Sequence, residues 1–192
     1  MLKILKITTA AGTLLLATGA QATGSSALLM NDDSVKYHYI AAPNIMLLHT
    51  IYQEHSVMYS QEPGPRNVLG TTTYETENYA WKFRENHSIT PRVTGMVGEF
   101  KDQGFAAVAG GAIYRYKPEE SKLTVVSEIY SSIPATTVIR GNFIWSARAQ
   151  LNYTVEKELE INVGYRNINV ELLNKVYDGF ERGLYFGLTH YH

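Results

Sequence analysis

The sequence predicts an all-β fold, an antiparallel up-and-down transmembrane β-barrel. Three observations lead to this prediction: a clean two-residue alternation in residues 142–155, no convincing amphipathic helix, and a succession of strand-like segments separated by turn residues. Side chains of a strand point alternately to its two faces, so this alternation describes two faces that meet different surroundings.

The chain opens with a segment typical of a secretory signal peptide. Lys3 and Lys6 form a basic start, residues 7–17 are mostly apolar, and residues 20–22 (AQA) fit a cleavage site. The apolar run is well short of the ~20 residues that a spanning helix needs, so we expect cleavage after Ala22. The predicted organisation is a signal peptide over residues 1–22, an N-terminal lead-in over 23–44 and a barrel domain over 45–192.

Composition narrows the classes of protein that fit. There is no cysteine, so an exported domain must be held by its core or by a closed sheet. Without Lys3 and Lys6 the chain carries 15 basic and 18 acidic residues, a net charge of −3. The two signs are interspersed, which predicts no nucleic-acid partner. No later segment approaches a spanning apolar helix, so strands would have to carry the chain through a membrane.

Strand-like segments follow one another along the barrel domain. Counting them favours eight wall strands: residues 45–59, 68–86, 92–100, 104–116, 122–130, 142–155, 159–170 and 180–192. Residues 35–42 form a further short candidate strand within the lead-in. Ten strands is the alternative: if residues 35–42 form a spanning strand, we expect residues 68–86 to split in two.

The predicted connections alternate in length over the C-terminal half. Residues 117–121 (KPEES) and 156–158 (EKE) are short turns, whereas residues 131–141 and 172–179 are longer loops. Short turns at one end and longer loops at the other are typical of outer-membrane barrels. Residues 101–103 depart from this alternation, because they form a short connection where a long loop is expected.

The two faces of residues 142–155 predict which side chains meet lipid. Phe143 through Val155 would face lipid at every second position, while Arg148, Gln150 and Asn152 would face the lumen. The same alternation in the other segments predicts a set of lipid-facing aromatic residues: Trp81, Trp145, Tyr153, Tyr165 and Phe186.

Charged residues collect on the opposite face of the predicted strands. They are Lys82, Arg84, Arg115, Glu128, Arg148, Glu160, Arg166 and Glu181. A barrel of eight strands has room inside for side chains and not for an aqueous channel. Opposite charges packed there should pair, because an unpaired buried charge is costly. We therefore expect a charge network that fills the lumen, rather than an open pore.

Four segments resemble the YfaZ family of bacterial outer-membrane proteins: GGAIYRYKP (residues 110–118), SEIYSSIP (127–134), VGYRNINVE (163–171) and DGFERGLYFGL (178–188). The resemblance implies an outer-membrane location, with membrane lipids and the outer-membrane assembly machinery as partners, and it implies no catalytic residue. Closing strands of such proteins usually end in an aromatic residue, whereas this chain ends in His192.

No catalytic or cofactor motif stands out, so we expect neither an enzyme nor a bound cofactor. Two imidazoles at residues 190 and 192 on one strand face are able to bind a metal, but a frayed terminus at an interface is the better explanation of His190 and His192, and we assign no metal. A lipid-modifying enzyme using Glu54, His55 and Ser56 is one alternative. Neighbouring residues of a strand point to opposite faces, which places His55 and Ser56 badly for a base and its nucleophile.

The main alternative is a soluble periplasmic barrel of the lipocalin kind. In such a protein the two faces are inverted, and Phe143, Trp145 and Leu151 line a pocket for a small apolar ligand. Weak alternation in residues 45–59 and 92–100 leaves this alternative open.

Overall fold

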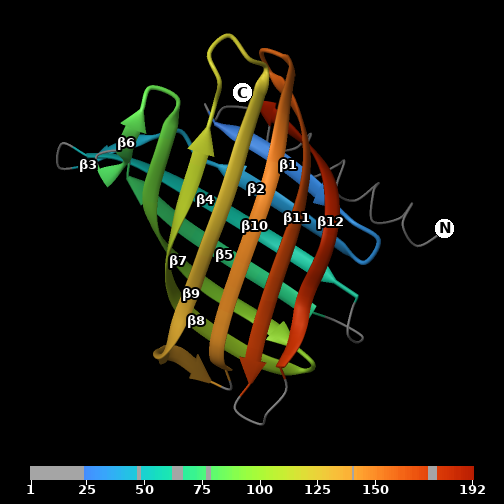
Figure 1. Cartoon of the computed structure of the whole chain (residues 1–192). Coiled ribbons are helices and arrows are strands. Elements are labelled where there is room, and N and C mark those ends of the chain that lie inside the picture. The colour runs from blue at the N-terminus through green and yellow to red at the C-terminus, as the bar shows by residue number, and fades with distance from the viewer. Residues whose placement is uncertain (1–23, 47–48, 62–66, 77–78, 140, 173–176) are drawn as a thin grey trace.

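The computed structural model describes residues 24–46, 49–61, 67–76, 79–139, 141–172 and 177–192, and in them the chain forms one antiparallel sheet closed into a barrel (Figure 1). Ten strands make the wall, in this order: β1 (Ser25–Met30), β2 (Ser34–Ile40), β4 (His49–Ser60), β5 (Asn67–Thr76), β7 (His87–Phe100), β8 (Gln103–Tyr116), β9 (Leu123–Ile139), β10 (Gly141–Glu156), β11 (Leu159–Leu172) and β12 (Tyr177–Tyr191). Two short strands, β3 (Asn44–Met46) and β6 (Trp81–Arg84), pair with β4 and β7. Across these residues, no helix has the length and apolar character needed to span a membrane.

The first and last strands close the wall. β1 pairs with β12 from Ser25 opposite Tyr191 to Met30 opposite Phe186, and β2 joins the other side of β1 to β4. Both ends of the described chain therefore lie at one end of the barrel, which we call the terminal end (Figure 1). The opposite end, where β1 turns into β2 and β7 turns into β8, is the far end.

The predicted fold class is confirmed at the level of an all-β antiparallel barrel, but the preferred count of eight strands is wrong. The two additional wall strands, β1 and β2, come from residues 23–44, which we predicted to be a lead-in outside the barrel. Residues 68–86 do not split into two wall strands, because β5 is one wall strand and β6 only pairs beside β7. The barrel therefore begins at Ser25, about twenty residues earlier than predicted.

Two predicted boundaries also move. Most of the expected loop over residues 131–141 belongs to β9, whose register with β8 jumps from Ala107–Thr137 to Ala109–Ser132. This bulge accommodates Pro134 within the strand. The strand predicted after Pro91 begins earlier, at His87. Pro91 lies where β7 changes its neighbour from β6 to β5, a position that does not require a ladder hydrogen bond from that residue.

The register of the pairs gives the tilt of the strands. Each residue can be followed to its directly paired residue on the next strand around the barrel. Starting at Phe186 and passing through β1, β2, β4 and β5, this path reaches Glu99 of β7. Passing the other way around the barrel, through β11, β10, β9 and β8, it reaches His87 of the same strand. The stagger is therefore 99 − 87 = 12 residues around ten strands. Such a stagger corresponds to strands tilted by about 40° from the barrel axis.

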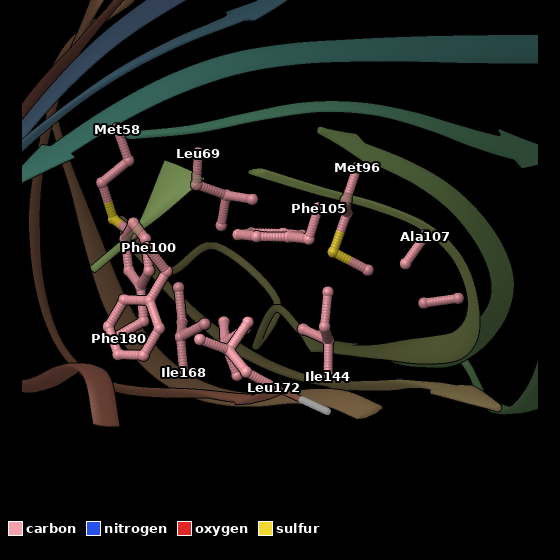
Figure 2. Packing of buried hydrophobic residues seen from close by; sticks show 12 residues of the cluster. Met58, Leu69, Met96, Phe100, Phe105, Ala107, Ile144, Ile168, Leu172 and Phe180 are labelled. Atoms are coloured by element: carbon pink, nitrogen blue, oxygen red, sulfur yellow. The ribbon is translucent and has the colours of Figure 1, made fainter. Parts of the chain in front are cut away.

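An apolar cluster fills the far end of the lumen. Its side chains come from seven wall strands and point toward one another inside the wall (Figure 2): Met58, Leu69, Met96, Phe100, Phe105, Ala107, Ala109, Ile144, Ile168, Val170, Leu172 and Phe180. Phe100 and Phe180 are fully buried, with ring centroids 5.7 Å apart. We call this cluster the apolar plug, because it closes the lumen at the far end with tightly buried side chains.

Gly164 makes room for a buried tyrosine, and this gives a first prediction. A Cβ at residue 164 would lie 2.5 Å from the Tyr185 hydroxyl oxygen and 2.7 Å from the carbonyl oxygen of Ala149. We expect Gly164→Ala to lower the free energy of unfolding by about 1–3 kcal/mol, because the Tyr185 ring must shift. Gly110→Ala is the matched control, since no heavy atom lies within 4 Å of its Cβ position. Urea titration of the folded barrel measures both, and equal stabilities would contradict the assignment.

Candidate functional site

A network of ion pairs crosses the middle of the lumen, with Arg92 of β7 at its centre. The Arg92 guanidinium donates from Nη2 to Glu54 of β4 and from Nη1 to Glu128 of β9, and its Nε lies 3.3 Å from Glu75 of β5. Its side chain is only 3% exposed. A buried guanidinium needs such partners, because removing its charge from water without compensation costs several kcal/mol.

The three carboxylates around Arg92 have further basic partners. Glu128 pairs with Arg148 of β10 at 2.9 Å, and Glu54 lies 3.2 Å from Nε2 of His38 on β2. Glu75 accepts two hydrogen bonds from Arg115 of β8, at 2.6 and 2.8 Å. The network thus joins seven wall strands, and opposite charges are balanced within it.

A second ion pair ties the N-terminal hairpin to the last two strands. Arg166 of β11 donates twice to Glu181 of β12, both at 2.6 Å. Glu181 also accepts from the Ser34 hydroxyl at 2.6 Å and from the Asn31 amide at 2.9 Å. A register shift beside Ile168 places Phe180 and Glu181 inside the barrel although they are consecutive, so one joins the apolar plug and the other pairs with Arg166.

The structure brings together most of the predicted lumen charges and leaves out two. Arg148, Glu160, Arg166 and Glu181 are buried, Glu128 has a side chain that is 10% exposed, and Arg115 is partly exposed but paired. Lys82 and Arg84 are instead exposed, because β6 pairs only with the terminal end of β7, past the end of β5. They lie outside the buried network, although Lys82 lines a cavity at the terminal end of the lumen.

Sequence reasoning missed several members of the network. These are His38, Glu54, Glu75 and Arg92, together with Lys36, which borders the same small internal cavity as Glu54 and Glu128. Thr90, Arg92, Thr94 and Met96 occupy every second position of β7, and all four are buried. Recognising this period of two could have placed Arg92 on the inner face of the strand.

The outer surface of the wall is mostly apolar. Of the predicted outward aromatic residues, Trp81, Tyr153, Tyr165 and Phe186 are exposed and Trp145 is half-buried. Exposed apolar side chains lie on eight wall strands and form what we call the outer apolar belt: Val57, Val68, Tyr74, Val93, Val97, Val108, Leu123, Ile129, Leu151, Tyr153, Ile161, Val163, Tyr165, Leu184, Phe186 and Leu188. In β10, by contrast, Ile144, Ser146 and Arg148 are buried.

Polar residues replace the belt toward the far end. On β11 the outward positions after Tyr165 are Asn167, Asn169 and Glu171, which alternate with plug residues. On β12, exposed Arg182 precedes Leu184, and its Nε donates to the Tyr165 hydroxyl at 2.9 Å. The long C-terminal strands therefore continue past the apolar belt with a polar outer surface.

The terminal end of the lumen is open. Two adjoining cavities of about 550 and 470 Å³ lie there, and both are lined by Ser25, Ile40, Glu54, Arg115 and Tyr191. We call the pair the chamber. The buried ion-pair network forms its inner boundary, and beyond the network lies the apolar plug.

The histidines considered from the sequence do not assemble into a reactive group. His55 bonds Thr72 on the exposed outer surface at 3.1 Å, whereas buried Ser56 bonds Thr71 at 2.7 Å. The nitrogen atoms Nδ1 of His190 and His192 lie 3.2 Å apart, and Nε2 of His192 is 3.0 Å from the Ser26 hydroxyl. Within the described ranges, no group of three or more potential ligands could hold a metal ion.

Comparison with known proteins adds no relative. No protein-family model matches the chain, and no curated protein or solved structure is significantly similar to it.

Proposed function

We propose that the protein is a small outer-membrane β-barrel whose lumen is closed by side chains at its middle and far end, with a structural or interaction role carried by its far end. The observation that carries the proposal is the outer apolar belt, which covers eight of the ten wall strands around a lumen crossed by buried charges. A soluble barrel would be expected to place these faces the other way round. In lipid, the apolar side chains of the belt are favourably solvated and the paired charges are kept away from hydrocarbon.

Strand length and tilt support the same proposal. Wall strands β7 to β12 have between 14 and 17 residues. A tilted strand needs about 9–11 residues to cross the hydrocarbon, so the C-terminal strands are long enough to extend beyond it. The polar outer positions Asn167, Asn169 and Arg182 lie in this excess length. This arrangement favours the far end as the part that meets other molecules outside the cell.

The closed lumen argues against a porin-like role. A ten-stranded wall is wider than the eight-stranded wall predicted, but the ion-pair network and the apolar plug occupy the additional space. The predicted resemblance to the YfaZ family implies the same location, and it remains a prediction. The outer-membrane assembly machinery and lipids are the partners that follow from the proposal.

Fractionation of the native cell envelope tests the proposal. We expect the protein in the outer-membrane fraction, with different mobility on SDS gels before and after boiling, because closed barrels resist SDS until heated. The same material in a planar bilayer should give no steady, large conductance. Recovery from the soluble periplasm without a heat-dependent shift would contradict the membrane location, and a steady conductance would contradict the filled lumen.

A further inference from the structure

We propose that the chamber at the terminal end is a binding site for a small organic anion with an apolar body, such as an aromatic carboxylate. This inference does not rest on the membrane location, because the chamber is formed by the inside of the barrel.

The size and shape of the chamber suit a small ligand. Its two parts, about 550 and 470 Å³, share five lining residues and so adjoin each other. Sites for small molecules commonly measure about 300–1,000 Å³. The ion-pair network below the chamber is deeply buried, with Arg92 at 3% and Arg148 at 7% side-chain exposure. A ligand would therefore enter and leave through the terminal end.

The charge of the chamber favours an anion. At its floor the charges cancel, because Glu54, Glu75 and Glu128 pair with Arg92, Arg115 and Arg148. Around the mouth of the smaller part, two lining lysines, Lys117 and Lys157, outnumber the single lining carboxylate there, Glu160. These lining groups therefore carry a surplus of one positive charge, which attracts and holds negative ligands.

Arg115 is the charged group of the network that can contact a ligand in the chamber. It lines both parts of the chamber, and its side chain is 37% exposed, in contrast to the other arginines of the network. Its two hydrogen bonds to Glu75 use two of the five N–H donors of a guanidinium. Lys117 follows two residues later at the same end of β8. A carboxylate between these two side chains could accept from both.

The wall of the chamber also has an apolar part. Ile40 lines both cavities, and Ala27, Leu29, Ile113 and Val126 line the smaller one. Such side chains give no favourable contact to a bare inorganic ion, whereas they can cover a ring or a short hydrocarbon body. The combination of a cationic mouth and an apolar wall is what selects an organic anion.

Calorimetric titration of 2-naphthoate tests the inference, with 2-naphthylmethylammonium as the probe of opposite charge. The purified full-length mature protein is used in whichever form the cell yields it, with protein-free detergent or buffer as the blank. We expect saturable binding of one naphthoate per barrel and at least tenfold weaker binding of the cation.

Three variants locate the site. Replacing both mouth lysines, Lys117→Glu with Lys157→Glu, should weaken naphthoate binding at least tenfold, whereas Lys122→Glu, an exposed lysine that does not line the chamber, should leave it within twofold. Ile40→Trp should abolish binding by filling the wall that both cavities share. The lysine variants change exposed side chains and retain the core, so they test the site even if Ile40→Trp does not fold.

Several outcomes would overturn the inference. They are the absence of saturable naphthoate binding, equal binding of the cation, or an equal effect of Lys122→Glu. Because a soluble barrel could still bind naphthoate and an outer-membrane barrel could fail to, these results are separate from those that test the membrane location.

Discussion

An arginine introduced at residue 147 should prevent stable insertion into the outer membrane, whereas removing the arginine at residue 148 should not. Ala147 lies on the outer face of β10, paired with exposed Ile129, while Arg148 is buried inside the barrel. An arginine facing lipid near the middle of the bilayer costs about 2–4 kcal/mol. In Arg148→Ala, Glu128 keeps its contact with Arg92 and the outer face is unchanged.

The measurement is the fraction of each variant that reaches the outer membrane in the heat-modifiable form. We expect Ala147→Arg to be degraded or to accumulate unfolded in the periplasm, and Arg148→Ala to be recovered largely in the membrane. Ala147→Leu is the control for size, because it enlarges the same position without charge. Equal tolerance of Ala147→Arg and Arg148→Ala would exclude the proposed orientation of β10.

Removing the central arginine of the network should cause the largest loss of stability. In Arg92→Met, Glu54, Glu75 and Glu128 all lose a partner in the buried interior. Breaking a buried ion pair by removing one side costs about 3–5 kcal/mol, because the remaining charge stays buried without compensation. Urea titration of the folded barrel should detect this as a lower midpoint of unfolding.

Two comparisons separate this effect from a general effect of losing an arginine. Arg182→Met removes an exposed arginine of the outer surface and should change the midpoint little. Glu54→Gln in the Arg92→Met background removes one of the stranded charges, so it should recover part of the loss. An unchanged midpoint in Arg92→Met would show that the network does not hold the wall strands together.

The strands of the C-terminal half could be predicted because their two faces differ so clearly. In β10 and β11 the buried and exposed positions alternate almost without exception, so Arg148, Glu160 and Arg166 were assigned to the interior from the sequence. Their partners were harder to find. Arg92 follows Pro91, and a proline ordinarily marks the edge of a strand, whereas here β7 changes neighbours at that point.

Residues 35–42 were a candidate strand, but β1 and the place of the N-terminal hairpin in the wall could not be predicted, for a different physical reason. In β1, Ser25 and Ala27 face the lumen and Ser26 faces the other way, yet all three are buried, because the side chains of His192 and Tyr37 lie against Ser26. The alternation that marks a strand is therefore absent. In β2, Lys36 and His38 point inward toward acidic residues of other strands. The sequence of residues 34–40 alone does not predict these partners, because they are far away along the chain. The chamber has the same origin, because its lining comes from strands far apart in the sequence.

Closure by β1 and β12 has a consequence for the time course of folding. Ser25 pairs with Tyr191, and the His192 amide donates to the Gly24 carbonyl oxygen at 2.9 Å, so the wall cannot close until the last residues of the chain are available. Contacts over such sequence separations form slowly. Until closure the chain exposes both its apolar belt and its unpaired strand edges, and a chain in that state is prone to aggregate. A carrier that protects the chain from aggregation would therefore matter during that interval more than after the barrel has closed.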